Sequence, residues 1–418
     1  MAHYSINPGR QISGTVEISG SKNAALPILA ACLLCEGTFT LHSIPNLVDT
    51  RNMLNLLKHF GVKYNTFTPN SISIDSGICT IKSAPHEIVN LLRASFLIIG
   101  PLLARFGKIR IPLPGGCRIG ARPIDLHLKG FAAMGAKIKQ GHGYVDLKCD
   151  KLVGSKIYLD FPSVGATENI MLAASLADGK TIIENAATEP EIENLADFLC
   201  KMGADVKGAG SDTISITGKK KLHSAEHTII PDRIEAGTFM AIAAVSRSCL
   251  TLNNVIPEHL KPVTAKLCEM GISVTENQNS IRITPCDRLH SVDIKTLPYP
   301  GFPTDMQAQF MPLMSIADGT GVVVETIFEN RFMQVPELMR MGAKIRIDGR
   351  TAVIDGTKRL SGAKVRATDL RAGASLVIAA LAAQGGSDIY NIEHIERGYE
   401  NFVGKLSEIG VDIKREND

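Results

Sequence analysis

The residue types best suited to covalent and acid–base chemistry meet in one segment, IPLPGGCRIGARPID, at residues 111–125. Its prolines exclude a central strand, and its two consecutive glycines give the backbone unusual freedom. Cys117 follows those glycines, with Arg118 and Arg122 close behind. Nearby guanidinium groups favour the thiolate and raise its reactivity. The segment therefore predicts a reactive cysteine on a loop that closes over an anion. The alternative is a tight turn with an incidental cysteine.

The other eight cysteines lie mostly in apolar runs, where burial disfavours the thiolate, so we expect Cys117 to react alone. Cys32 and Cys35 form a C-x-x-C pair inside AALPILAACLLCEG, which favours buried helix thiols over redox or metal chemistry. No second Cys or His pair has zinc-ligand spacing, so we expect no metal site. Nine cysteines without the spacing of a disulfide scaffold favour a reducing cytoplasm.

Polar residues gather directly before the most apolar segments, as in SKNAA at 21–25 and DLRAGAS at 369–375. A helix N-terminus carries partial positive charge, and a cation beside it favours anionic ligands. The cations at such starts are Lys22, Arg93, Arg233 and Arg371. A second polar set follows short strand-like runs and includes Glu189, Arg331 and Arg397. Because both sets recur in register, they predict one shared cleft. Helix capping and surface charge are the alternative.

Asp305 lies in FPTDMQAQ, at or near a predicted helix start. A lone carboxylate at such a position often only caps the helix. If Asp305 faces the same cleft as the cations, it could instead take a proton from a hydroxyl group.

The elements that position these residues form an internal repeat. A signature of an apolar residue, glycine, a small apolar residue, a polar residue and an apolar residue recurs six times. Its glycines are Gly61, Gly135, Gly203, Gly271, Gly342 and Gly410, separated by 74, 68, 68, 71 and 68 residues. Each unit reads as an apolar small-residue helix, a short strand, an amphipathic helix and one or two alternating strands. With the strand before the first helix, this is a β-α-β-α-β-β unit of about 70 residues.

Three such units could surround a common helical core with their sheets outside, so six units predict two pseudo-threefold domains. The division falls near HTIIPDR at 227–233. We expect one domain at residues 22–229, carrying the loop 111–122. The other contains residues 1–21 and 230–418, because the N-terminal strand most simply completes the sheet of the last unit.

Composition narrows the functional class. The chain of 418 residues has 45 basic and 42 acidic side chains and no tryptophan, so it offers neither a basic excess nor an aromatic platform for nucleic acids. No stretch reaches the roughly 18 apolar residues needed to cross a membrane. The first residues lack the apolar core of a secretory signal. We therefore expect a cytoplasmic protein that acts on small molecules.

The motifs together resemble a known family. SKNAALPI, LPGGCRIGARPIDLH, SVGATENIM, PDRIEAGTF, FPTDMQAQF, FENRFMQVPELMRMGA and DLRAGASLVIA look like the UDP-N-acetylglucosamine enolpyruvyl transferases. The resemblance runs from about residue 5 to about residue 415. It implies two inside-out α/β barrel domains, each of three β-α-β-α-β-β repeats. The repeats indicate the same number of units.

The resemblance also implies an activity. Members of the family transfer the enolpyruvyl group of phosphoenolpyruvate to the 3′-hydroxyl of UDP-N-acetylglucosamine and release phosphate, the first committed step of peptidoglycan synthesis. The reaction is an addition followed by an elimination and implies no metal or organic cofactor. We expect a monomer whose partners are these two substrates.

Site residues follow by the same resemblance. The catalytic set is Cys117 as proton donor, Asp305 as base, Lys22 and Arg397. The phosphoenolpyruvate-binding set is Lys22, Asn23, Arg122, Arg371 and Arg397. The set that binds UDP-N-acetylglucosamine is Asn23, Arg93, Arg122, Ser163, Val164, Gly165, Asp305, Ile327 and Arg331. Glu189 and Asp369 fall on positions that order the site.

Two departures and two alternatives remain. Val48 and Phe161 stand where some members carry lysines that approach the nucleotide, so we expect diphosphate contact to depend on residues 163–165 and Arg122. The loop keeps the cysteine that epoxides such as fosfomycin alkylate, whereas some members have aspartate there. The nearest alternative is a shikimate-type enolpyruvyl transferase, which shares the fold and the donor. The other is a non-catalytic sugar-nucleotide sensor.

Overall fold

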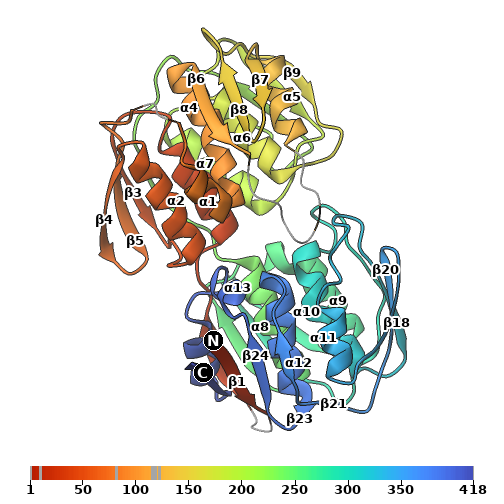
Figure 1. Ribbon diagram of the computed structural model, residues 1–418. Helices are drawn as coiled ribbons and strands as arrows, with labels where there is room; N and C mark the ends of the chain where they lie inside the picture. The colour runs from red at the N-terminus through yellow and green to blue at the C-terminus, as the bar shows by residue number, and fades with distance from the viewer. Residues whose placement is uncertain (1, 9–11, 81–82, 114–119, 121–123, 418) are drawn as a thin grey trace. The chain divides into compact units, whose positions relative to one another are not determined.

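The computed structural model describes residues 2–8, 12–80, 83–113, 120 and 124–417. They divide into two compact units (Figure 1). The central unit contains the described residues of 20–113 and 124–230. The terminal unit contains those of 2–19 and 231–417, with Gly120. Each unit has its own hydrophobic core.

The central unit contains three repeats of helices and strands. The first repeat has α1 (Lys22–Ala31), β3 (Thr38–His42), α2 (Val48–His59), β4 (Lys63–Thr68) and β5 (Ser71–Asp75). The second has α3 (His86–Leu91), η1 (Arg93–Ile98), α4 (Ile99–Phe106), β6 (Lys108–Pro112), α5 (Asp125–Ala133), β7 (Lys137–Gly141) and β8 (Tyr144–Lys148). The third has β9 (Lys156–Tyr158), α6 (Val164–Ala174), β10 (Lys180–Glu184), α7 (Pro190–Lys201), β11 (Asp205–Lys207) and β12 (Thr213–Thr217), and β13 (Glu226–Thr228) follows it.

The terminal unit begins with β1 (Ala2–Asn7) and β2 (Gly14–Glu17). The fourth repeat has α8 (Arg233–Val245), β14 (Leu250–Asn253), η2 (Pro257–Leu260), α9 (Lys261–Glu269), β15 (Ser273–Glu276) and β16 (Ser280–Thr284). The fifth has β17 (Ile294–Lys295), α10 (Thr304–Ser315), β18 (Thr320–Val324), α11 (Val335–Arg340), β19 (Lys344–Asp348) and β20 (Thr351–Asp355). The sixth has β21 (Leu360–Ser361), β22 (Lys364–Arg366), α12 (Leu370–Ala382), β23 (Ala383–Gln384), β24 (Ser387–Tyr390), α13 (Glu393–Glu396), α14 (Phe402–Glu408) and β25 (Asp412–Asn417).

Each repeat contributes one small sheet, which is antiparallel in the second repeat and mixed in the others. The sheets of the central unit have the orders β13-β3-β5-β4, β6-β8-β7 and β11-β12-β10-β9. Those of the terminal unit have the orders β15-β16-β14-β2, β17-β18-β20-β19 and β22-β24-β1-β25, beside the two-stranded sheet β21-β23. Within the four-stranded sheets, β9, β13, β2, β17 and β22 each pair in parallel with the strand that follows a core helix.

The N-terminal segment divides its two strands between two sheets. As expected, β1 completes the sheet of the last repeat, because it lies antiparallel between β24 and β25. β2 instead pairs with β14 of the fourth repeat. β13 precedes α8 in the chain but pairs with β3 of the first repeat. In each unit, one sheet therefore includes a strand that comes just before the chain passes into the other unit. That strand is β2 in the terminal unit and β13 in the central unit.

Apolar helices form both cores, as the sequence predicts. α4 and α1 pack on α6 in the central unit, and α8, α10 and α12 pack on one another in the terminal unit. Every residue of α8 after Arg233 is buried. The sheets lie outside these helices (Figure 1). Small side chains let the helices approach closely, and burial on all sides explains why their sequences show so little polar character.

The six signature glycines share one conformation. Gly61, Gly135, Gly203, Gly271, Gly342 and Gly410 have φ between 91° and 98°. Each follows the C-cap residue of the last helix of its repeat. Glycine reaches positive φ without a steric penalty, so it ends the helix and turns the chain into the next strand.

Candidate active site

The first helix of the central unit positions one of the predicted cations. Ser21 caps α1, since its side chain accepts from the N–H of Ala24. Lys22 follows, and its Nζ donates to Asp49 Oδ2 at 3.1 Å. The Lys22 and Asp49 side chains are 12% and 5% exposed. The ammonium group is thus held by a buried partner at the start of a helix, beside the half-buried Asn23.

A second helix start in the same unit brings together Ser163, Val164 and Gly165. Ser163 caps α6 through the N–H of Ala166. The ring of His127 lies beside Gly165, where a Cβ would be 3.3 Å from its Cε1 atom. Burial, followed by the positive charge of Arg93, lowers the pKa of His127 to about 3. The imidazole is therefore neutral at pH 7, and its Nδ1 accepts from Asn169 Nδ2 at 3.1 Å.

Glu189 belongs to a group of three carboxyls. It is the N-cap residue of α7, followed by Glu191 in the first turn. Glu168, on α6, is buried, and burial followed by Glu191 and Glu189 raises its pKa well above the usual range. Burial therefore favours the protonated, neutral form of Glu168. No motif in the sequence marks Glu168, Glu191 or His127 as a buried polar group.

In the terminal unit, Asp305 lies between two arginines. It is the second residue of α10, and its Oδ1 accepts from Arg331 Nη2 at 2.6 Å. Its Oδ2 accepts from Arg371 Nε at 3.2 Å and from Arg371 Nη2 at 3.0 Å. Both arginines are 4% exposed. Asp305 is thus no simple helix cap. It is the shared partner of two buried cations that the sequence analysis assigned to substrates.

Arg371 is held from several directions. Asp369 caps α12 by accepting from the N–H groups of Arg371 and Ala372, at 2.9 and 3.1 Å. The guanidinium carbon lies 5.5 Å from the ring centroid of Tyr399. Burial alone would lower the pKa of Arg371, but Asp305 and Tyr399 outweigh it, so the pKa is raised. Among the described residues, Arg371 Nη1 and Arg331 Nε are buried atoms without a hydrogen-bond partner.

The comparisons with known proteins agree on one family. The family model of EPSP synthase (3-phosphoshikimate 1-carboxyvinyltransferase) matches residues 6–406. UDP-N-acetylglucosamine 1-carboxyvinyltransferase 2 of Carboxydothermus hydrogenoformans is 56% identical over 420 residues, covering 100% of both chains. UDP-N-acetylglucosamine 1-carboxyvinyltransferase 1 of Caldanaerobacter subterraneus subsp. tengcongensis is 55% identical over 410 residues, covering 97% of each chain. The chain belongs to the UDP-N-acetylglucosamine 1-carboxyvinyltransferase family.

Solved structures agree on the fold. The enolpyruvyl transferase NikO from Streptomyces tendae is 25% identical and superimposes with a TM-score of 0.90, covering 100% of this chain and 99% of that chain. EPSP synthase from Acinetobacter baumannii is 21% identical, with a TM-score of 0.80 and 100% of both chains covered. The predicted fold class, the enolpyruvyl transferase type of α/β protein, is confirmed.

The predicted site residues of this family member fall on both units. The central unit holds Lys22, Asn23, Arg93, Ser163, Val164, Gly165 and Glu189. The terminal unit holds Asp305, Ile327, Arg331, Asp369, Arg371 and Arg397. Cys117 and Arg122 lie outside the described residues. Of the positions where some relatives carry lysine, Val48 begins α2 and Phe161 is 43% exposed.

The cysteines other than Cys117 differ in burial. Cys32 and Cys35 are buried, and burial raises the pKa of both thiols. Cys200 and Cys268, however, are exposed. Both lie on the solvent side of amphipathic helices, α7 and α9, where an apolar neighbourhood in sequence does not mean burial. Exposed thiols can therefore compete with Cys117 for alkylating reagents.

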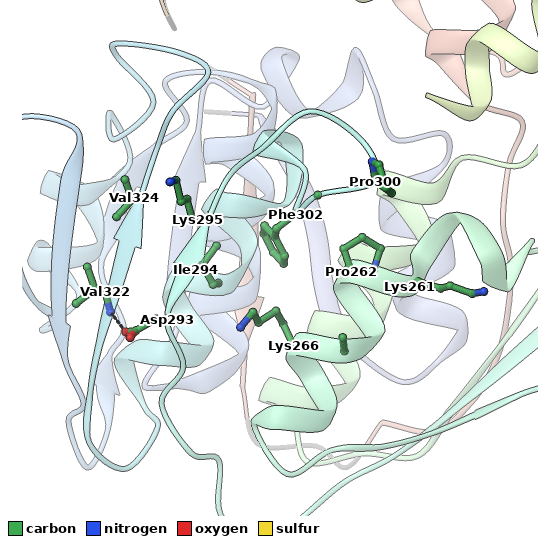
Figure 2. Close-up of a pocket in the computed structure, with 12 residues that line it drawn as sticks. Lys261, Pro262, Lys266, Asp293, Ile294, Lys295, Pro300, Phe302, Val322 and Val324 are labelled. Atoms are coloured by element: carbon green, nitrogen blue, oxygen red, sulfur yellow. Dashed lines mark hydrogen bonds between the residues drawn. The ribbon is translucent and has the colours of Figure 1, made fainter. Parts of the chain in front are cut away.

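A cavity of about 680 Å³ lies in the terminal unit, between α9 and the β17–β18 edge of a sheet (Figure 2). Ile294, Phe302, Val322 and Val324 supply apolar lining, and Lys266 and Lys295 supply charge. None of the predicted site residues lines it.

Among the described residues, no group of three His, Cys, Asp or Glu side chains could hold a metal ion. Within the residues that the structure describes, no helix is long and apolar enough to cross a membrane.

Proposed function

We propose that this protein transfers the enolpyruvyl group of phosphoenolpyruvate to the 3′-hydroxyl of UDP-N-acetylglucosamine and releases phosphate. The observation that carries this proposal is identity of 51–56% over nearly the whole chain to four proteins named for that activity. The reaction is the first committed step of peptidoglycan synthesis. The same identity argues against a shikimate-type substrate, because the EPSP synthase structure shares only 21%.

Asp305 acts as the base in this proposal. The two oxygens of Asp305 accept three hydrogen bonds from Arg331 and Arg371. As the sugar oxygen attacks the second carbon of phosphoenolpyruvate, the carboxylate takes the proton of the 3′-hydroxyl. The two guanidinium groups hold the carboxylate in a fixed orientation before the reaction, which lowers the entropic part of the activation barrier.

Cys117 donates the proton that the methylene carbon of phosphoenolpyruvate gains in the addition. The tetrahedral intermediate then loses a proton from the new methyl group and expels phosphate, which restores the carbon–carbon double bond of the enolpyruvyl group, now attached to the sugar oxygen. Arginine binds carboxylate and phosphate oxygens in a two-pronged geometry, which suits Arg122, Arg371 and Arg397 to the anionic donor. Lys22 and Asn23 complete that set.

The nucleotide sugar occupies the remaining predicted residues. The N-terminus of α6, at Ser163, Val164 and Gly165, offers N–H groups to the diphosphate. The other contacts are Asn23, Arg93, Arg122, Asp305, Ile327 and Arg331, with Glu189 and Asp369 ordering the site. The domains in this proposal are residues 22–229, and residues 1–21 together with 230–418, and the protein acts as a monomer in the cytoplasm.

Phosphate release from phosphoenolpyruvate, with and without UDP-N-acetylglucosamine, tests the activity. Release should require the sugar nucleotide. Release that is indifferent to it would contradict the proposal, and release with shikimate 3-phosphate instead would support the nearest alternative.

Cys117→Ser should nearly abolish turnover at neutral pH, because a hydroxyl is a far poorer acid than a thiol, whereas Cys117→Asp should retain activity with an altered pH profile.

A further inference from the structure

In four repeats, the residue directly after the strand that follows the core helix adopts the same left-handed backbone conformation. Ser43, Asn185, Asn254 and Asn391 occupy this position in four repeats, all with φ between 54° and 60°. The three asparagines each donate to the carbonyl directly after the neighbouring parallel strand. The acceptors are Leu159 O at 2.7 Å, Ile18 O at 2.7 Å and Ala367 O at 3.4 Å, respectively. One short amide thus ties the ends of two parallel strands together.

The fifth repeat departs from this pattern. Glu325 follows β18 at the equivalent position and is 1% exposed. Its Oε1 accepts from Thr296 Oγ1 at 2.9 Å and from the backbone N–H groups of Ile327 and Phe328 at 2.8 and 3.2 Å. Thr296 directly follows β17, so the tie between parallel strands is kept. The second carboxylate oxygen is left to make a bond that asparagine does not make in the other repeats.

That second oxygen, Oε2, accepts from Thr304 Oγ1 at 2.9 Å. Thr304 is the first residue of α10, directly before Asp305. The core helices α1, α6, α8 and α12 begin behind a serine or aspartate whose side chain caps the helix. α10 begins behind Pro303, which makes no side-chain cap. Glu325 therefore supplies from β18 the anchor that α10 lacks at its own start.

We propose that Glu325 is a positioning residue that places Asp305 through Thr304 and places the turn at Ile327 through two backbone N–H groups. The inference rests on the proposed function, which assigns Asp305 and Ile327 to the sugar nucleotide. The anchor sets the first turn of α10, and that turn sets where Asp305 meets Arg331 and Arg371. Displacement by about 1 Å can lower a rate about a hundredfold, so such an anchor acts on turnover without touching substrate.

The length of the side chain distinguishes Glu325 from the asparagines of the other repeats. Asparagine is shorter by one methylene, so it cannot reach both Thr296 and Thr304. Glutamine keeps the reach: its carbonyl oxygen can take the three Oε1 bonds, and its NH₂ group can donate to Thr304 once that hydroxyl rotates. Glu325→Asn should therefore break the anchor, and Glu325→Gln should largely preserve it.

The test is a double-mutant cycle on the full-length enzyme with kcat, KM for both substrates and thermal stability as readouts. Glu325→Asn and Thr304→Val should each lower kcat about tenfold or more, and the double variant should fall little further, because both break one link. Glu325→Gln should stay within about threefold of the parent. Asn254→Asp is the matched control: aspartate tolerates the left-handed backbone but cannot donate to Ile18 O, so stability should fall while kcat stays unchanged.

Several outcomes would overturn the anchor. One is a Thr304→Val variant that turns over like the parent, which decides the matter even if Glu325→Asn does not fold. Others are effects that multiply in the double variant, or a Glu325→Gln variant as slow as Glu325→Asn. Parental turnover is measured first. If the parent releases no phosphate in response to UDP-N-acetylglucosamine, the proposed function fails, and a crystal structure of Thr304→Val decides the anchor by whether Asp305 keeps its bonds to Arg331 and Arg371.

Discussion

Glu168 in the central unit and Asp305 in the terminal unit are both carboxyl groups on core helices, α6 and α10, but their surroundings differ. Asp305 accepts three hydrogen bonds from two guanidinium groups. Glu168 lies near two further carboxyls, Glu189 and Glu191, and burial is the largest cause of its raised pKa. His127, in the same unit as Glu168, is also kept neutral by burial.

The difference shows two ways of placing ionisable groups inside a protein. Around Asp305 the charges remain and neutralise one another. Removing one partner therefore leaves the other charged groups without an opposite charge in a region of low dielectric. Around Glu168 and His127 the groups give up their charge, so their stability depends on pH and little on any single partner. The predictions below test this contrast, starting with the variant for which we expect the largest effect.

Asp305→Asn should be the most damaging change. It leaves the buried guanidinium groups of Arg331 and Arg371 facing a neutral amide, and breaking a buried pair typically costs about 3–5 kcal/mol of unfolding free energy. Because the base is also lost, kcat should fall about a hundredfold or more, with a smaller change in KM. Urea unfolding and steady-state kinetics measure the two effects.

Asp355→Asn is the control for Asp305→Asn, since Asp355 makes an exposed ion pair with Arg346 at 3.4 Å. It should cost less than about 1 kcal/mol and leave kcat unchanged. Equal loss of stability in the two variants would contradict the view that the buried guanidinium groups depend on Asp305.

His127→Gln should change how stability depends on pH. The folded-state pKa of about 3 lies below the ordinary value of 6.5, so between these values the unfolded chain binds the proton more strongly. The contribution of His127 is therefore complete above pH 6.5 and is lost as pH falls. From pH 6.5 to 5 the parent should lose about 2 kcal/mol more than His127→Gln in urea unfolding. His223→Gln, at an exposed histidine, should keep the parental slope.

Glu168→Gln should have the smallest effect at pH 5. A protonated carboxyl and an amide are both neutral, so the unfolding free energy at pH 5 should change by less than about 1 kcal/mol. The folded state holds the proton that the unfolded chain loses above about pH 4.5, so the parent loses stability as pH rises. Glu168→Gln lacks this loss and should gain on the parent between pH 5 and 8. A variant as unstable as Asp305→Asn would mean that Glu168 is ionised and paired.

Much of the fold could be predicted from particular residues. The six signature glycines recur because a backbone with φ near 95° strongly favours glycine, so a conformational requirement appears directly in the sequence. The core helices could be predicted because burial on every side removes polar residues from their sequences. The number of repeats and the apolar helical cores followed from these two signals.

The electrostatic details could not be predicted in the same way. Asp305 lies 26 residues from Arg331 and 66 from Arg371, and no local pattern links side chains across such separations. Glu168 lies inside the apolar run SVGATENIM, where nothing distinguishes a protonated carboxyl from a charged one. Glu325 follows the apolar strand TGVVV and resembles a surface residue at a strand end. Long-range pairing and local dielectric decide all three.

The position of β1 between β24 and β25 has a consequence for biosynthesis. Ala2 pairs with Asn417, so β1 leaves the ribosome long before β25, and its sheet is complete only when β25 has been made. At about 5–20 residues per second, synthesis of the roughly 400 intervening residues takes roughly 20–80 s. During that time the central unit can fold on its own, while the first strand stays unpaired and open to chaperones. Loss of the last few residues would leave that strand exposed along one edge, and such an edge invites aggregation.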